Sequence, residues 1–214
     1  MSLVIAIDGP AASGKSSVGR KLAAKLHAVF VNSGAMYRAV TWAALRDGVA
    51  VSNAEAVAHW VQSLEISCLA QDGRSAIRID GSDPEPHLRD PEVNAAVSIL
   101  SAVPEVRRIL VEKLRSYAAL GPVVMEGRDI GSVVFPDTPH KFYIDASEEV
   151  RAARRRAQGE TDSIASRDAQ DSTRKTAPLT VAPDAVVVDS SNLSIDAVVG
   201  EIERHLARQG VHVC

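Results

Sequence analysis

Aromatic residues are scarce in this chain, at 4% of its 214 positions, which leaves little material for a surface that stacks nucleic-acid bases. A surplus of positive charge is also lacking, because the formal net charge at pH 7 is −3. Broad attraction to nucleic acid or to an anionic membrane needs such a surplus. We therefore expect no nucleic-acid partner and no membrane partner. Any anion site must be built from a few local residues.

Cysteine is nearly absent, and Cys68 and Cys214 have no metal-ligand spacing. Two unpaired thiols are typical of a reducing compartment. The apolar run at residues 3–7 is too short to span a bilayer, and it lacks the basic start and the cleavage site of a signal peptide. We expect a cytoplasmic protein.

The chain does contain alternating buried strands and amphipathic helices. Short apolar runs, typical of strands buried on both faces of a parallel sheet, lie at residues 3–8, 29–31, 122–125, 141–145 and 185–189. Helical spacing of apolar residues occurs at 15–26 and 34–46, and again after 148 and 194. Ser52 and Glu55 are spaced as a capping box for a further helix that runs to about residue 63. The pattern predicts an α/β fold with a five-stranded parallel sheet flanked by helices.

One stretch interrupts this alternation. Residues 64–80 alternate apolar and polar positions around an Asp-Gly turn, which predicts an antiparallel hairpin. Pro91 and Pro104 then resemble two successive helix starts, because proline is tolerated in a first turn. We expect one domain over residues 1–214, with an inserted small subdomain at about residues 64–103.

The sequence GPAASGKS at residues 9–16 matches the phosphate-binding pattern GxxxxGK[ST] in full, and it lies between a buried strand and a helix. Glycine lets backbone N–H groups approach phosphate oxygens, and the helix dipole favours negative charge there. Lys15 adds a positive charge for the β- and γ-phosphates, and the Ser16 hydroxyl can hold Mg²⁺. The predicted nucleotide-binding residues are Gly9, Pro10, Ala11, Ala12, Ser13, Gly14, Lys15, Ser16 and Ser17.

Other segments must decide the reaction, because phosphate loops also serve GTPases and motor ATPases. The Asn-Lys-x-Asp string that reads guanine does not occur in the sequence. Arg38 ends the segment 33–38 with which the second helix begins, and Arg128 follows the strand at 122–125, so both lie at the sheet edge where α/β proteins bind ligands. We expect Arg38 to face the phosphate loop, and both arginines to point into one cleft. Asp8 could either close the sheet edge or reach Mg²⁺ through water.

Several strings are more selective than the phosphate loop. They are IDGP at residues 7–10, SGAMYR at 33–38, EGRDIG at 126–131, VVFPD at 133–137, APL at 177–179 and DS at 189–190. In these strings, which extend over nearly the whole chain, the sequence resembles the bacterial cytidylate kinase family of P-loop nucleoside monophosphate kinases. The resemblance implies transfer of the γ-phosphate of ATP to CMP or dCMP, giving ADP and CDP or dCDP, with Mg²⁺ as cofactor.

The resemblance also implies roles for particular residues. The implied cytosine contacts are Ser98, Arg107 and Asp129. The implied contacts of the acceptor phosphate are Arg38, Arg128 and Arg174. Near the sugar it places Arg167 and Asp171, and along the acceptor pocket Ser33 and Tyr37. Surface ion pairs with Glu105 and Glu112 are the alternative for Arg107 and Arg108.

A lid at about residues 151–174 is implied as well, although its stretch between Arg156 and Arg167 is shorter than is usual in the family. The candidates for contact with the donor phosphates are Arg151, Arg154, Arg155 and Arg156, of which we favour Arg154. The implied catalytic residues are then Lys15, Arg128, Asp129 and Arg154.

Positioning and charge stabilisation are the main requirements of phosphoryl transfer, which suits a site rich in cations. A monophosphate needs no general base, since its second pKa is about 6 and its oxygen is already ionised. A kinase for UMP, AMP or a small phosphorylated metabolite is the nearest alternative. A nucleotide-regulated binding protein is a remote one, because a switch does not need the clustered arginines. We expect a monomer.

Overall fold

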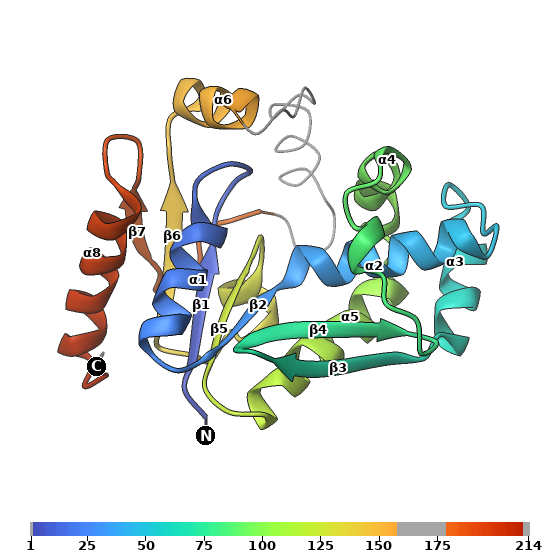
Figure 1. The fold of residues 1–214 in the computed structure, drawn as a ribbon, viewed down its shortest axis with the longest axis horizontal. Coiled ribbons are helices and arrows are strands. Elements are labelled where there is room, and N and C mark those ends of the chain that lie inside the picture. The colour runs from blue at the N-terminus through green and yellow to red at the C-terminus, as the bar shows by residue number, and fades with distance from the viewer. Residues whose placement is uncertain (1, 158–178, 212–214) are drawn as a thin grey trace.

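The computed structural model describes residues 2–157 and 179–211 (Figure 1). Within these residues, seven strands form one sheet in the order β3-β4-β2-β5-β1-β6-β7. In chain order they are β1 (Val4–Asp8), β2 (Val29–Asn32), β3 (Ile66–Gln71), β4 (Arg74–Ile79), β5 (Val123–Gly127), β6 (Lys141–Asp145) and β7 (Val186–Asp189). All five apolar runs that predicted parallel strands are strands in this sheet.

Helices cover both faces of the sheet. In chain order they are α1 (Lys15–Lys25), α2 (Ser33–Arg46), α3 (Ala54–Trp60), α4 (Pro91–Leu100), α5 (Pro104–Ser116), α6 (Glu148–Ala157) and α8 (Ile195–Arg208). Short turns of 3₁₀-helix occur at Val61–Ser63, Glu85–His87 and Tyr117–Ala119, and a π-helical turn occurs at Ile130–Val134. Both proline starts are confirmed, because α4 and α5 begin at Pro91 and Pro104.

The two layers of core explain the continuous apolar runs. Ile5 and Ile7 of β1 pack in a cluster with α1 and α8, whereas Ala6 packs in a cluster with α2 and α5. Successive side chains of a strand point to opposite faces of the sheet. A strand covered on both faces therefore has no polar position, and all five residues of β1 are buried.

The predicted count of five strands is wrong, because the β3-β4 hairpin joins the same sheet. β4 lies parallel to β2, with Phe30 opposite Arg74, and Phe30 N donates to Gly73 O at 2.9 Å. Alternating polarity predicted the hairpin itself. Its attachment to β2 depends on backbone hydrogen bonds, which the side-chain pattern does not indicate. Ile79 of β4 is fully buried in the core shared with α2 and α5. The limits of the inserted subdomain stay a prediction.

The helix predicted from Ser52 begins slightly later, because Asn53 is its N-cap. The Asn53 side chain accepts a hydrogen bond from Ala56 N at 3.1 Å. Serine and asparagine are both good N-caps, so their order in the sequence does not decide between them.

The carboxyl ends of three neighbouring strands bring the predicted site segments together. β1 leads into the phosphate loop, β2 into α2, and β5 into the turn that holds Arg128. In the ribbon, α6 lies above these ends (Figure 1). None of the helices in residues 2–157 and 179–211 is both long and apolar enough to cross a membrane.

Replacing Ile79 by alanine should lower the free energy of unfolding by about 3 kcal/mol, because a buried side chain of the shared core is truncated. Urea unfolding followed by circular dichroism measures it, and we expect a single transition. Leu69→Ala in the same hairpin is the control. Leu69 is 48% exposed, so its replacement should change the free energy by less than about 0.5 kcal/mol. A hairpin that unfolds alone, leaving the main transition unchanged, would contradict a shared core.

Candidate active site

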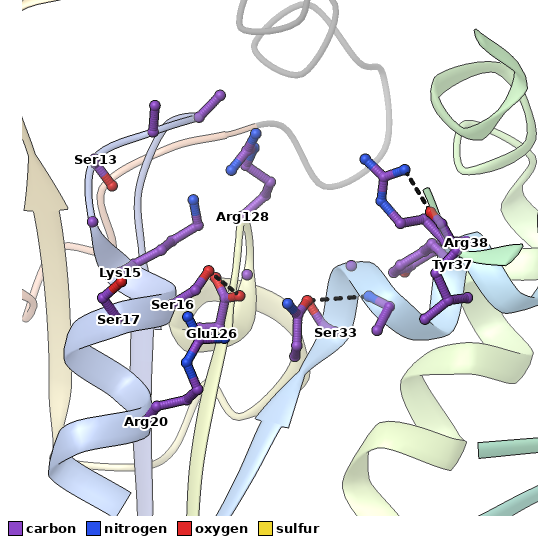
Figure 2. Close-up of a pocket in the computed structure, with 18 of the residues that line it drawn as sticks. Ser13, Lys15, Ser16, Ser17, Arg20, Ser33, Tyr37, Arg38, Glu126 and Arg128 are labelled. Carbon is purple, nitrogen blue, oxygen red and sulfur yellow. Dashed lines mark hydrogen bonds between the residues drawn. The ribbon is translucent and has the colours of Figure 1, made fainter. Parts of the chain in front are cut away.

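The strand ends surround a cavity of about 920 Å³, which is a suitable volume for small-molecule ligands. Residues 11–17 of the phosphate loop and the start of α1 form one side, and α2 and α4 form the other. Residues 126–129 lie between the two sides. Figure 2 shows Lys15, Ser16 and Arg128 across the pocket from Arg38 and Tyr37.

The phosphate loop packs tightly against the sheet at its first position. Gly9 has a φ of 152°, and a Cβ at this position would lie 2.1 Å from the Ile144 carbonyl oxygen of β6. Only glycine therefore fits here. Gly14 is the N-cap of α1 and has no side chain to satisfy the first N–H groups, as an anion-binding helix start requires. Lys15 is buried and donates from Nζ to the Pro10 carbonyl at 2.7 Å.

Ser16 is joined to a carboxylate that the sequence analysis did not single out. Its hydroxyl donates to Glu126 Oε1 at 2.7 Å, and Glu126 is buried at the end of β5 (Figure 2). The position of Glu126 at the carboxyl end of a buried strand is the sequence signal that could have indicated this role. Hydroxyl and carboxylate oxygens are ligands that Mg²⁺ accepts. Among the residues that the structure describes, no group of three or more His, Cys, Asp or Glu could hold a metal ion.

Two arginines of α6 contact the phosphate loop. Arg154 donates from Nη1 to the Ser13 carbonyl at 3.2 Å and from Nη2 to the Ser190 carbonyl at 2.7 Å. Arg151 donates from Nη1 to the Ala11 carbonyl at 3.3 Å. Arg154 also lines the cavity, so its guanidinium lies where it can exchange a bond to a neutral carbonyl for a stronger charge-assisted bond to phosphate.

The two arginines predicted to point into one cleft both line the cavity. Arg128 donates from Nη1 to the Gly9 carbonyl at 3.0 Å. Arg38 lies across the pocket, where its Nη1 donates to the Leu88 carbonyl at 3.0 Å and to Asn94 Oδ1 at 2.5 Å (Figure 2). Both guanidinium groups therefore belong to one cavity, with the Arg128 bond to Gly9 on the side of the phosphate loop.

A buried ion pair joins Arg107 of α5 to Asp129, and both side chains line the pocket. Arg107 also donates to the Ser101 carbonyl at 3.3 Å, and its guanidinium lies 5.4 Å from the Tyr37 ring centre. The surface ion pairs belong to Arg108, which contacts Glu105 and Glu112. The surface alternative is therefore wrong for Arg107.

Asp8 bonds to the backbone of the turn after Asp129. Its Oδ1 accepts from Ile130 N and its Oδ2 from Gly131 N, each at 2.7 Å. Burial raises the pKa of Asp8 to about 6, against the lowering effect of these two hydrogen bonds. Of the two roles considered for Asp8, these contacts correspond to closing the sheet edge, because the carboxylate binds the backbone of the turn that follows β5.

Most of the predicted site residues line the same cavity. They are Ala11, Ala12, Ser13, Gly14, Lys15, Ser16, Ser17, Ser33, Tyr37, Arg38, Ser98, Arg107, Arg128, Asp129 and Arg154. Gly9 and Pro10 are buried at the start of the loop. Outside the described residues lie Arg167, Asp171 and Arg174, together with the lid from residue 158 onward.

Comparison with known proteins places this geometry in context. The family model described as cytidylate kinase matches residues 5–208. A cytidylate kinase of Nocardia farcinica is 44% identical, covering 97% of this chain and 94% of its own length. One of Symbiobacterium thermophilum is also 44% identical, covering 96% of each chain. A solved gluconokinase from Sinorhizobium meliloti is 16% identical with a TM-score of 0.50, covering 97% of this chain and 93% of its own, and is similar in fold.

The raised pKa of Asp8 predicts a pH dependence of stability that Asp8→Asn removes. Because the pKa is about 6 in the folded protein and 3.8 ordinarily, the stabilising contribution exists below pH 3.8 and is lost as pH rises through 6. The free energy of unfolding of the wild type relative to the variant should therefore fall by about 2 kcal/mol from pH 4 to pH 7. Urea unfolding at a series of pH values measures it. A difference that stays constant with pH would contradict the raised pKa.

Proposed function

This chain belongs to the cytidylate kinase family, and from that premise we propose that it transfers the γ-phosphate of ATP to CMP or dCMP by in-line displacement, releasing ADP and CDP or dCDP. Cytidylate kinase activity makes the protein a phosphotransferase. One observation carries the proposed mechanism. The phosphate loop, Arg128 and a buried Arg107–Asp129 pair all line one cavity.

The donor half of the reaction belongs to the phosphate loop and α6. Lys15 and the first N–H groups of α1 would hold the β- and γ-phosphates. Arg154 and Arg151 donate to loop carbonyls in this structure. When ATP is bound, they would stabilise the negative charge that develops in the transition state. Mg²⁺ bound with ATP would neutralise phosphate charge, and Ser16 and Glu126 are the residues that would hold it.

The acceptor half is suited to a cytosine monophosphate. Cytosine presents an amino donor beside ring acceptors, and a carboxylate paired with a guanidinium offers the complementary acceptor and donor. The buried Asp129 and Arg107 supply these groups, while Arg38 and Arg128 would bind the phosphate. Uracil presents an oxygen in place of the amino group, so Asp129 would face an acceptor and bind UMP less well.

Substrate orientation is the main contribution of these side chains to the chemistry. The acceptor oxygen is ionised near neutral pH, so it attacks without a general base. Lys15, Arg128 and Arg154 would bring two polyanions into line and compensate their repulsion. A monomeric state and a cytoplasmic location, expected from the sequence, stay predictions.

Kinetics with CMP, dCMP, UMP and AMP test the proposed acceptor. We expect kcat/KM for CMP to exceed that for UMP by about tenfold or more, because uracil leaves Asp129 facing an acceptor. A coupled ADP-release assay measures it. A preference for AMP would overturn the base assignment.

Lys15→Ala should lower the rate by about a hundredfold or more, whereas a nucleotide-regulated switch would show no transfer in either protein.

Glu126→Gln should raise the Mg²⁺ concentration needed for half-maximal rate by roughly tenfold, because a carboxylate that would hold the ion loses its charge. Magnesium titration at saturating ATP and CMP measures it. Glu112→Gln on the exposed side of α5 is the matched control and should behave as the wild type. Equal magnesium curves for Glu126→Gln and the wild type would contradict the proposed role.

A further inference from the structure

The π-helical turn at Ile130–Val134 is capped in an unusual way. Asp129 is its N-cap, a position where aspartate ordinarily accepts a hydrogen bond from the backbone of the first helical turn. Within residues 2–157, the Asp129 side chain makes no such capping bond. It pairs instead with Arg107 on the pocket wall. The first N–H groups of the turn must therefore be satisfied by another residue.

Asp8 is that residue, and it belongs to a different strand. Its two carboxylate oxygens accept from Ile130 N and Gly131 N, the first two N–H groups of the turn, each at 2.7 Å. Asp8 pairs with Gly127 across the β1-β5 ladder, so the carboxylate reaches over the strand end. The contact is tight, because a Cβ on Gly131 would lie 3.3 Å from Asp8 Oδ2 and 3.2 Å from the Lys141 side chain.

Both oxygens of Asp8 are needed as acceptors, which requires a carboxylate rather than an amide. Asparagine has only one acceptor oxygen, so it would turn its NH₂ group toward one of the two backbone N–H groups. That N–H and the NH₂ group would then both lack an acceptor. Asp8 is 5% exposed, so no surrounding water compensates such a loss. Arg128 directly precedes Asp129 and donates to the carbonyl of Gly9, the residue after Asp8.

We propose that Asp8 is a positioning residue of the acceptor site. By capping the turn from β1, it leaves the carboxylate of Asp129 to Arg107 and to the acceptor base. Without Asp8, the Asp129 carboxylate would compete for the N–H groups of its own turn and weaken the pair with Arg107. The inference rests on the proposed function, because it takes Asp129 as a residue of acceptor recognition.

The kinetic effect of Asp8→Asn tests the inference. We expect the KM for CMP to rise about tenfold and kcat to fall, while the KM for ATP changes by less than about twofold. The ATP side is held by separate contacts of Lys15 and Arg154 with the loop. Steady-state kinetics at pH 7.5, with each substrate varied in turn, separate the two constants. A loss of stability alone would lower the active fraction and leave both KM values unchanged.

A double-mutant cycle shows whether Asp8 acts through Asp129. In an Asp129→Asn background, Asp8→Asn should raise the KM for CMP by less than about threefold. Thr138→Val is the matched structural control. It removes the hydrogen bond from Thr138 Oγ1 to the Val4 carbonyl, 2.6 Å long, at the opposite end of β1. This variant should lose stability and keep the wild-type KM for CMP.

Gly131→Ala keeps the inference testable if Asp8→Asn does not fold. Its Cβ would press on Asp8 Oδ2 and on the Lys141 side chain, so it should raise the KM for CMP in the same direction. The inference is wrong if the wild type phosphorylates CMP and neither variant changes the KM for CMP more than that for ATP. It is also wrong if the Asp8 effect is undiminished in the Asp129→Asn background. A wild type that does not phosphorylate CMP would instead overturn the proposed function.

Discussion

The parallel pairing of β1 with β5 is the constraint on which the rest of the site depends. The ladder runs in register from Val4 opposite Val123 to Asp8 opposite Gly127, so both strands end at the same level. The phosphate loop leaves one strand and the Arg128 turn leaves the other. Their separation is therefore a property of the backbone ladder and not of any contact between their side chains. Two hydrogen bonds then fix the two loops against each other: Arg128 donates to the Gly9 carbonyl, and Ile130 N donates to the Asp8 carboxylate.

Buried charge is concentrated at this end of the sheet. The side chains of Asp8, Lys15, Glu126 and the Arg107–Asp129 pair are all buried. Burial of ionic groups is costly unless hydrogen bonds and opposite charges compensate it, and replacement by apolar residues is often neutral or stabilising. Their placement around one cavity accords with a role in binding polyanions, for which a well-packed apolar core would be of no use.

Side-chain patterns predicted the features that side chains determine. Apolar runs located the buried strands, and the glycine-lysine pattern located the phosphate loop. Features set by backbone pairing or helix phase were missed or left open. The bond from Phe30 N to Gly73 O attaches the hairpin without any side chain, and the phase of α5 turns Arg107 inward and Arg108 outward. Glu126 was overlooked because its contact with Ser16 spans 110 positions of sequence.

The closeness of Gly9 to β6 has a consequence for how this protein can vary. The Ile144 carbonyl occupies the space that a side chain at position 9 would need, although β6 itself provides none of the residues that line the pocket. Substitutions that shift β6 sideways would thus deform the phosphate loop without altering any residue in it. Natural variation in the core that β6 shares with helix α8 should accordingly be conservative in volume, because this packing holds the Ile144 carbonyl in place.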